Sequence, residues 1–469
     1  MPRGILALLV LIGGLLGGCS LAPEYARPPA PMPAHWPQGE AYAPGAEAPQ
    51  SPEVPDLKWR DFFADAKLKK VIDMALANNR DLRLAALNVD RVRALYGLQR
   101  AELLPAVNAV ATGGKDRASD DLVKPGNART TDQYSLSLGV ASWEIDFFGR
   151  IRSLGDQALQ EFLATEQARR GAQIALVSEV ARVYLSLAAD KENLSLAQST
   201  LETQSAAYGL VQKRHDAGLA NELDLRRAQL PLETARVDIA RYTQLVAQDQ
   251  NSLNLLAGQP VADDLLPVDL SGVAMPRDVH PGLSSEVLLR RPDIMAAEHR
   301  LKGAYAFIGA ARAAFFPRIA LTTSLGTASN ELSGLFGPAS DTWNFTPRIV
   351  MPIFDARVWA ALRVSEADQK IILTQYEKAI QTAFRETADA LAAQGAMDRQ
   401  VAAQASLVTA ASETHRLSSR RYMQGIDSYL GVLDAQRTLF AAQQGLVSLR
   451  LAKSANQARL YAVLGGGGD

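Results

Sequence analysis

Two segments of the chain alternate between apolar residues and small or polar residues with a period of two. In YSLSLGVASW (134–143) the apolar residues fall at even positions, with serine or glycine between them. In WNFTPRIVMPI (343–353) they fall mostly at odd positions, and weaker alternation occupies 105–113 and 317–327. One apolar face and one small or polar face are typical of membrane-barrel strands. A soluble, half-buried hairpin is the alternative for the same pattern.

Long stretches without proline follow these strands. Residues 151–214 and 359–422 contain no proline, and each predicts one long helix. At a rise of 1.5 Å per residue, about sixty residues extend on the order of 90 Å. In the first stretch Val180, Leu187, Leu194, Leu201 and Tyr208 lie seven apart, which predicts a coiled-coil-like seam.

The chain contains an internal duplication. KRHDAGLANELDLRRAQLPL (213–232) aligns without a gap with RRYMQGIDSYLGVLDAQRTL (420–439), which sets Gly218 on Gly425. Residues 81–105 align in the same way with 293–317, and the first copy has five more residues before its long helix. The copies differ where Asp434 of the second replaces Arg227 of the first. Pro231, in the first copy alone, predicts a local bend.

The N-terminus has the features of a secretory signal. An apolar run follows Arg3 and leads to Leu-Gly-Gly-Cys19, which resembles a bacterial lipobox with Cys19 as the acylated residue. An ordinary signal peptide with an incidental cysteine is the alternative. Since Cys19 is the only cysteine, a disulfide within the chain is excluded. Ten of the 23 prolines lie between Ser20 and Pro55, which predicts an extended tether.

These observations divide the chain into segments with distinct roles. We expect a signal peptide at 1–18, a lipidated Pro-rich segment at 19–56, repeat 1 at 57–258 (β-hairpin about 104–146, helical turn about 218), a linker at 259–283, repeat 2 at 284–464 (β-hairpin about 316–353, helical turn about 425) and a Gly-rich tail at 465–469.

Charge and motifs exclude several classes of function. The chain has 49 Lys and Arg against 50 Asp and Glu, so it lacks the basic excess of a nucleic-acid-binding domain. It contains no phosphate-binding loop, no HExxH motif and no nucleophile elbow, and its five histidines are too dispersed for local metal-ligand spacing. We therefore expect no catalytic activity, no cofactor and no metal site.

Four strands in a chain cannot close a membrane barrel. Beyond residue 18 the sequence shows no apolar run of 18 residues, so we expect any crossing of the membrane to use strands. An open sheet edge leaves backbone groups unpaired in lipid, which predicts association of several copies. Two copies give eight strands, a barrel filled by its own side chains, and three give twelve, enough for a lumen. This favours a trimer.

The chain resembles the outer-membrane efflux channel family, specifically the OprM/NodT-like lipoproteins related to TolC. The matching stretches run through most of the mature chain and include AALNVDRVRA (85–94), WEIDFFGRIRSL (143–154), LLRRPDIMAAEH (288–299), IGAARAAFFPRI (308–319) and YLGVLDAQRTLF (429–440). The resemblance implies a mainly α-helical fold with a membrane β-barrel: a homotrimeric, twelve-stranded barrel on a long periplasmic α-helical barrel. It also implies a lipid-anchored location in the outer membrane.

The resemblance further implies particular residue roles. Leu430, Asp434 and Arg437 match the periplasmic aperture, although Asp434 and Arg437 also fit a solvated pair on one helix face. Arg421 and Tyr422 match residues whose links to the neighbouring coiled coil, through Asp224, hold the aperture shut; the alternative is ordinary packing. The resemblance also assigns contact with a periplasmic adaptor to four residues at the tips of the helical hairpins, which equally fit ordinary turn formation: Gly218, Leu219, Gly425 and Ile426.

The function that these features indicate is a passive, gated exit duct of a tripartite multidrug efflux pump. Its expected partners are a periplasmic membrane-fusion adaptor and an RND inner-membrane transporter. In this family the transporter selects the cargo, so the sequence names no substrate. The alternative is a periplasmic adaptor or structural coiled-coil lipoprotein, which the paired strands and the duplication disfavour.

Overall fold

The computed structural model describes residues 20–42, 57–124, 126–277 and 284–466, which form two compact units. The sheet unit comprises the described chain up to Pro29 together with Val89–Thr165 and Ala296–Tyr376. The hairpin unit comprises the described parts of Ala30–Asn88, Glu166–Met295 and Glu377–Asp469. The expected signal peptide, Cys19 and part of the expected tether lie outside the described residues.

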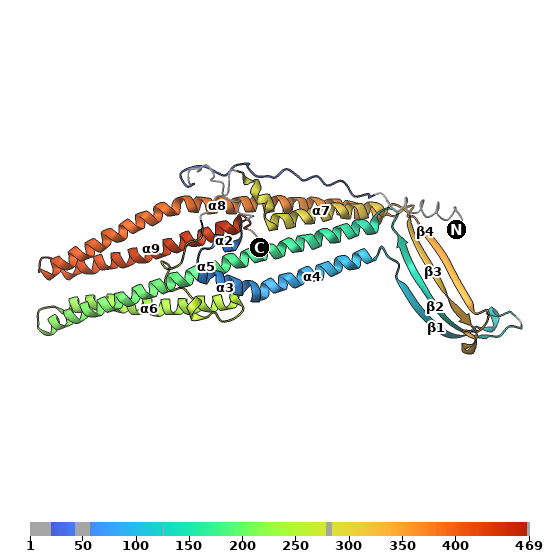
Figure 1. Ribbon diagram of the computed structural model, residues 1–469, viewed down its shortest axis with the longest axis horizontal. Helices are drawn as coiled ribbons and strands as arrows, with labels where there is room; N and C mark the ends of the chain where they lie inside the picture. Colours follow the sequence, from blue (N-terminus) through green and yellow to red (C-terminus); the bar gives the residue numbers. More distant parts are fainter. Residues whose placement is uncertain (1–19, 43–56, 125, 278–283, 467–469) are drawn as a thin grey trace. The chain divides into compact units, whose positions relative to one another are not determined.

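The sheet unit contains four antiparallel strands in the order β1-β2-β3-β4 (Figure 1). They are β1 (Val107–Arg117), β2 (Thr130–Ile145), β3 (Arg318–Ser329) and β4 (Asp341–Val350). Each copy of the duplication supplies one hairpin, and β2 pairs with β3 to join the two hairpins into one sheet. The extra residues of the first copy fall largely in β2, which has 16 residues against 10 in β4. Strands β1 and β4 are the edges of this sheet.

A β-bulge in β2 keeps the apolar side chains on one face of the sheet. The register shifts between Val140 and Trp143, where Ser142 has a φ of 58°. Before the bulge, even residues such as Leu138 pair with the apolar positions of β3; after it, odd residues such as Trp143 and Ile145 do so. The extra residue reverses the parity, so the apolar face continues along the whole strand. Its members include Leu138, Val140, Trp143, Ile145, Ile319, Leu321, Leu325, Trp343, Phe345 and Ile349.

The two long proline-free stretches each form one helix, as predicted from the sequence. Helix α5 (Arg150–Asp216) has 67 residues and α8 (Ala356–Met423) has 68. Together with α4 (Arg80–Ala101) and α7 (Pro292–Ala313) they belong partly to each unit. The hairpin unit also holds α2 (Trp59–Phe62), α3 (Ala66–Asn78), α6 (Glu222–Ala257) and α9 (Tyr429–Val463). Short 3-10 turns are η2 (Asp120–Leu122), η3 (Asp263–Leu265), η4 (Ser285–Arg290) and η5 (Leu332–Gly334).

Helix α5 is more apolar than the sequence analysis expected. Among the described helices it alone is long and apolar enough, by length and composition, to cross a membrane. An uninterrupted apolar run of 18 residues is nevertheless absent from α5, because Glu179 and Arg182 interrupt its apolar part. However, 61% of its most apolar window is buried against the rest of the chain. Packing in the protein core accounts for this composition.

The buried seam of α5 narrows along the helix. Val180 and Leu187 are fully buried, as the seven-residue spacing predicts, but Leu194, Leu201 and Tyr208 are only half-buried. Three residues further on in the same heptad frame, Val183, Ala197, Gln204 and Val211 are buried. Beyond Asn193 these positions alone carry the buried seam of α5, which therefore includes a polar residue, Gln204.

Aromatic packing and a buried arginine fix the C-terminal end of α9 in the hairpin unit. The Tyr461 ring stacks on Phe62, with 4.4 Å between ring centroids. The Arg291 guanidinium is 8% exposed; it pairs with the carboxylates of Asp293 and Glu386 and donates to the Val463 carbonyl oxygen at 2.7 Å. A buried arginine is stable only with such partners, so this network holds the end of α9 beside α7 and α8.

Candidate aperture at the hairpin ends

Two helical hairpins have the same backbone turn. The first hairpin joins α5 to α6 through Gly218, and the second joins α8 to α9 through Gly425; both glycines have a φ of 74°. In the first turn the Leu219 amide donates to the Arg214 carbonyl at 2.7 Å, and in the second the Ile426 amide donates to the Arg421 carbonyl at 3.0 Å. This is the helix-ending motif that requires a left-handed residue, which favours glycine.

The residues after both glycines are exposed. Leu219 is 71% exposed and Ile426 is 58% exposed, and added β-carbons on Gly218 or Gly425 would meet no atom within 4 Å. The described chain therefore leaves both tips open. This geometry is compatible with the expected contact of a partner with the four tip residues and equally with plain turn chemistry, so the assignment stays a prediction.

An apolar cluster holds the two hairpins side by side (Figure 1). The first hairpin contributes Val211, Leu225 and Ala228, and the second contributes Tyr429, Val432 and Leu433, with Tyr208 and Tyr422 packed against them. Burial of these side chains is the main stabilising contribution to the contact, at about 25 cal/mol per Å² of apolar surface removed from water.

Tyr422 contacts the first hairpin of its own chain. Arg214 donates to the Tyr422 hydroxyl at 2.8 Å, and the Arg214 guanidinium lies 5.6 Å from the centre of the ring. Tyr422 also packs on Tyr429, with 5.1 Å between ring centroids. Burial, with a smaller effect of Tyr422, raises the pKa of the Tyr429 hydroxyl. Within one chain, Tyr422 is therefore a contact between the hairpins.

Arg421 pairs within the second hairpin. Its guanidinium makes two hydrogen bonds to the carboxylate of Asp427, at 2.5 and 3.0 Å, and the pair is exposed. The hydrogen bonds from Arg421 lower the pKa of Asp427. Asp224 lies in the first turn of α6, where its amide donates to the Asn221 side chain, and its carboxylate makes no ion pair among the described residues. The link of Arg421 and Tyr422 to Asp224 of a neighbouring coiled coil stays a prediction.

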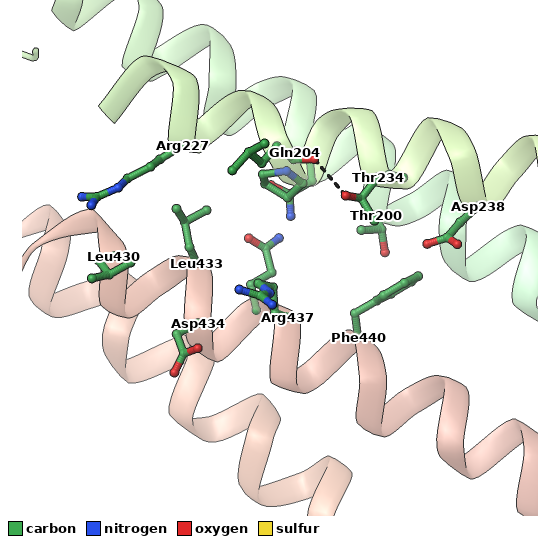
Figure 2. A pocket seen from close by; sticks show the side chains of 14 residues that line it. Thr200, Gln204, Arg227, Thr234, Asp238, Leu430, Leu433, Asp434, Arg437 and Phe440 are labelled. Atoms are coloured by element: carbon green, nitrogen blue, oxygen red, sulfur yellow. Dashed lines mark hydrogen bonds between the residues drawn. The ribbon is translucent and has the colours of Figure 1, made fainter. Parts of the chain in front are cut away.

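The expected aperture residues lie on one stretch of α9. Leu430 is 53% exposed, and the side chains of Asp434 and Arg437 are also exposed. In the described structure Asp434 and Arg437 do not form the ion pair with each other that their spacing allowed, and Figure 2 shows the Asp434 carboxylate directed away from α6. Among the described residues the Asp434 carboxylate is thus exposed and without an ion-pair partner.

All three residues expected at the aperture line a groove of about 580 Å³ (Figure 2). Its walls come from α5, α6 and α9, and Arg227, the counterpart of Asp434 in the first copy, also lines it. Pro231 lies in the same wall, inside the continuous helix α6. The bend expected there does not interrupt the helix. Since Pro231 has no N–H group, the carbonyl of Arg227 lacks its usual helical partner.

Several residues of this region escaped the sequence analysis. Asp427, the partner of Arg421, replaces Ala220 of the first copy, so it is a second break in the repeat and the alignment contained that signal. Arg214 and Gln204 carried no comparable signal because their roles depend on which helices pack together. Among the described residues, no group of three His, Cys, Asp or Glu side chains is arranged to hold a metal ion.

Comparison with known proteins assigns the family. A family model described as outer membrane efflux protein matches residues 71–259 and 283–466. The chain is 46% identical over 469 residues to the probable efflux pump outer membrane protein TtgC of Pseudomonas putida, which covers all of this chain and 96% of the relative. It is 41% identical over 470 residues to outer membrane protein OprJ of Pseudomonas aeruginosa, with 99% and 96% covered.

Solved structures agree with this assignment. The open state of the MtrE outer membrane channel of Neisseria gonorrhoeae has a TM-score of 0.85 and 36% identity, over 96% of this chain and 98% of that chain. A membrane protein from Pseudomonas aeruginosa has a TM-score of 0.89 and 40% identity, over 96% and 98%. The fold is that of outer membrane channels with a helical extension.

The chain belongs to the outer membrane efflux protein family. It is an outer membrane exit component of an efflux pump, as the sequence predicted. The fold class of long helices with membrane strands in two repeats is confirmed. The alternative of an adaptor or a structural lipoprotein is set aside. Members of this family are transport channels, which points away from an enzyme.

Proposed function

We propose that three copies of the chain close a twelve-stranded barrel and a coaxial helical tube, forming a passive exit duct. The observation that carries this proposal is the four-stranded sheet with an apolar face and edges at β1 and β4. In hydrocarbon each unpaired backbone group costs several kcal/mol, so other copies must pair these edges. Three copies supply twelve strands, enough for a lumen, whereas an eight-stranded barrel is filled by side chains.

The duct works with a periplasmic membrane-fusion adaptor and an RND inner-membrane transporter, and it has no catalytic activity of its own. The adaptor docks at the tips formed by Gly218, Leu219, Gly425 and Ile426. The inner-membrane transporter selects the cargo. Relatives that are 46% identical carry names that refer to toluene and antibiotic efflux, which favours small apolar and amphipathic organic compounds as cargo.

The second hairpin forms the gate. In a trimer, Asp434 of three chains surrounds the axis together with Leu430 and Arg437, and a ring of carboxylates favours cations. Arg227 of the first hairpin lines the wall of the same groove, and the charge of the ring itself comes from the second hairpin. Arg421 and Tyr422, with Asp224 of a neighbouring coiled coil, hold the ring closed.

The N-terminus anchors the chain. Cys19 carries the acyl chains, and each buried methylene group of such a chain contributes roughly 0.8 kcal/mol to membrane binding. Mass spectrometry of the purified protein tests this directly. A diacylated or triacylated N-terminal Cys19 supports the proposal, and an unmodified Cys19 in the mature chain contradicts it.

The duct is tested by single-channel recording of the purified full chain in a planar bilayer, together with heat-modifiable migration on a gel. We expect discrete conductance steps and an oligomer band that converts to monomer on boiling. The variant Asp434→Ala, which removes the carboxylate from the expected aperture, serves as a form whose aperture should be more open. Absence of conductance in both the native chain and Asp434→Ala would overturn the channel proposal.

The lock is tested separately by the double variant Tyr422→Phe with Arg421→Ser. It should raise single-channel conductance and the uptake of large antibiotics by cells. Arg226→Ser is the matched control, since Arg226 is an exposed arginine on α6 that pairs with Glu222 of its own helix. If the double variant behaves like this control, the lock assignment is wrong.

A further inference from the structure

The polar face of the four-stranded sheet carries small or uncharged side chains along most of its length. Strand pairing places Gly139 of β2, Ser324 of β3 and Asn344 of β4 in one row across the sheet. On β1 the hydroxyl of Thr112 lies 2.6 Å from that of Ser135 on β2, so both belong to the same face. Serine, threonine, alanine and glycine extend only a short way from the backbone. An arginine on this face therefore reaches further from the sheet than its neighbours.

The charged residues of the polar face lie near the ends of the strands. Glu144 of β2, Ala320 of β3 and Arg348 of β4 form one row, and Arg318 lies two residues before Ala320, on the same face. At this helix end of the sheet, β2 leads into α5 and α7 leads into β3. Asp116, the fourth charged residue of the face, lies on β1 near the opposite end. The strands thus place two arginines and one glutamate at the helix end.

Two other arginines already hold the carboxylate of Glu144. Arg150 donates to both of its oxygens, at 2.8 and 2.9 Å, and the Nε atom of Arg318 lies 3.5 Å from Oε2. Arg348 is exposed and makes no ion pair among the described residues. Even with Glu102, a second carboxylate that interacts with Arg150, the arginines outnumber the carboxylates. The helix end therefore has an excess of positive charge, and Arg348 is its unpaired member.

Neighbouring groups do not cancel this excess. Asp146 pairs with Arg152, and Asp355 pairs with Arg357, so each of these pairs is neutral overall. In the proposed trimer the edge strand β1 of the next copy pairs with β4. The charged residue on the polar face of β1 is Asp116, which lies near the end away from the helices. The excess of positive charge therefore remains at the helix end of the closed barrel.

We propose that Arg348, together with Arg318, makes an anion-selective ring inside the barrel, opposite in sign to the expected aperture. The inference rests on the proposed trimer: with the apolar face against lipid, the polar face lines the lumen, and three copies bring Arg348 to one level. Rings of arginine favour anions in pores, as rings of carboxylates favour cations. The ring attracts the carboxylate or other anionic group of cargo that has passed the aperture, so the duct selects for both signs in series.

The experiment measures the reversal potential of single channels of the purified full chain in a planar bilayer under a gradient of potassium chloride. Asp434→Ala is the common background, so that the carboxylate of the expected aperture does not dominate the selectivity. In this background Arg348→Gln should raise the ratio of potassium to chloride permeability about threefold at about 0.1 M salt, where the screening length is about 10 Å. At about 1 M salt the screening length is about 3 Å, and the effect should disappear.

Three further variants in the same background separate charge from structure. Arg348→Lys keeps the charge and should keep the ratio of the background. Asn344→Asp is nearly unchanged in volume, adds a carboxylate to the same face and should raise the ratio as Arg348→Gln does. Arg117→Gln is the control, because Arg117 pairs with Thr130 on the apolar face at the other end of the sheet, and it should leave the ratio unchanged.

Equal ratios in Arg348→Gln and Arg117→Gln overturn the inference, as does a shift that persists at about 1 M salt or that Arg348→Lys shares. If Arg348→Gln forms no heat-modifiable oligomer, Asn344→Asp decides, and an unchanged ratio in that variant overturns the inference. Channels that conduct with an unchanged ratio contradict only the ring. Absence of conductance in every chain contradicts the duct and the ring together.

Discussion

The two hairpin ends share a backbone and differ in their side chains. Gly218 and Gly425 have the same φ of 74° and end their helices with the same pattern of hydrogen bonds. In contrast, Asp427 and Asp434 of the second hairpin replace Ala220 and Arg227 of the first. Turn geometry restricts the backbone of both copies in the same way. The side chains around the turn can differ between the two copies, and we place the gate at the residues that differ.

A second difference lies further along the hairpins. The first hairpin places Asp190 of α5 beside Asp249 of α6, where the second copy has Met397 and Asn456. Burial, with the neighbouring Asp190 carboxylate, raises the pKa of Asp249 to about 6. Asn456 instead donates to the Ala390 carbonyl at 2.9 Å. This pair of neighbouring carboxylates therefore belongs to the first hairpin alone.

The largest expected effect on stability comes from the contact that joins the hairpins. Leu433 is 8% exposed in the shared cluster, so Leu433→Ala should cost ~2–4 kcal/mol and loosen both hairpin ends. Hydrogen exchange of the amides on either side of both turns is the measurement. Leu223→Ala is the control, because Leu223 is 56% exposed. Loss of protection in the second hairpin alone would mean that the cluster does not couple the two.

The turns should respond equally to substitution. Gly218→Ala and Gly425→Ala should each destabilise the protein by ~1–2 kcal/mol, since a left-handed conformation costs a non-glycine residue about that much. Thermal unfolding of the purified variants measures both. Gly209→Ala, in the interior of α5 with open space around it, should be neutral or stabilising. Unequal costs at the two turns contradict the equivalence of their backbones.

The acid pair should make stability depend on pH. The folded chain holds the Asp249 proton more tightly than the unfolded chain, in which an Asp has a pKa of about 3.9, so stability falls as pH rises from about 4 to about 6. The loss should be ~1 kcal/mol, because solvent screens the pair. Asp249→Asn should reduce this dependence and be more stable than the native chain at pH 8, while burial still raises the pKa of Asp190.

Unfolding curves at pH 4 and pH 8 test this expectation, with the exposed Asp264→Asn as the control. A pH dependence that persists unchanged in Asp249→Asn shows that the titrating group lies elsewhere.

The smallest effect is expected at Tyr422. Tyr422→Phe removes the hydrogen bond from Arg214 and keeps the ring packed on Tyr429, so the cost should be ~0.5–1 kcal/mol. Tyr208→Phe is the control within the same cluster, since no hydrogen bond of its hydroxyl is present in the described structure. Equal stabilities of the two variants indicate that the Arg214 contact contributes nothing.

The sequence predicted features that depend on local periodicity and missed those that depend on packing partners. Alternation placed the strands, absence of proline placed the long helices, and the aligned glycines placed both turns. The sequence could not predict that a bulge at Ser142 restores the apolar face, or that Gln204 is buried in the seam of α5. The partners of Arg421 and Tyr422 also depend on how the hairpins pack. An alignment of the two repeats shows which residues differ, whereas side-chain contacts depend on how the chain folds in three dimensions.

We propose that the second hairpin, and not the first, sets the charge of the aperture. The most direct test is the reversal potential of single channels under a salt gradient for Asp434→Arg and Arg227→Asp. We expect Asp434→Arg to convert a cation-preferring channel into an anion-preferring one, whereas Arg227→Asp should keep the preference for cations. Unchanged selectivity in Asp434→Arg, or a larger change in Arg227→Asp, would contradict it.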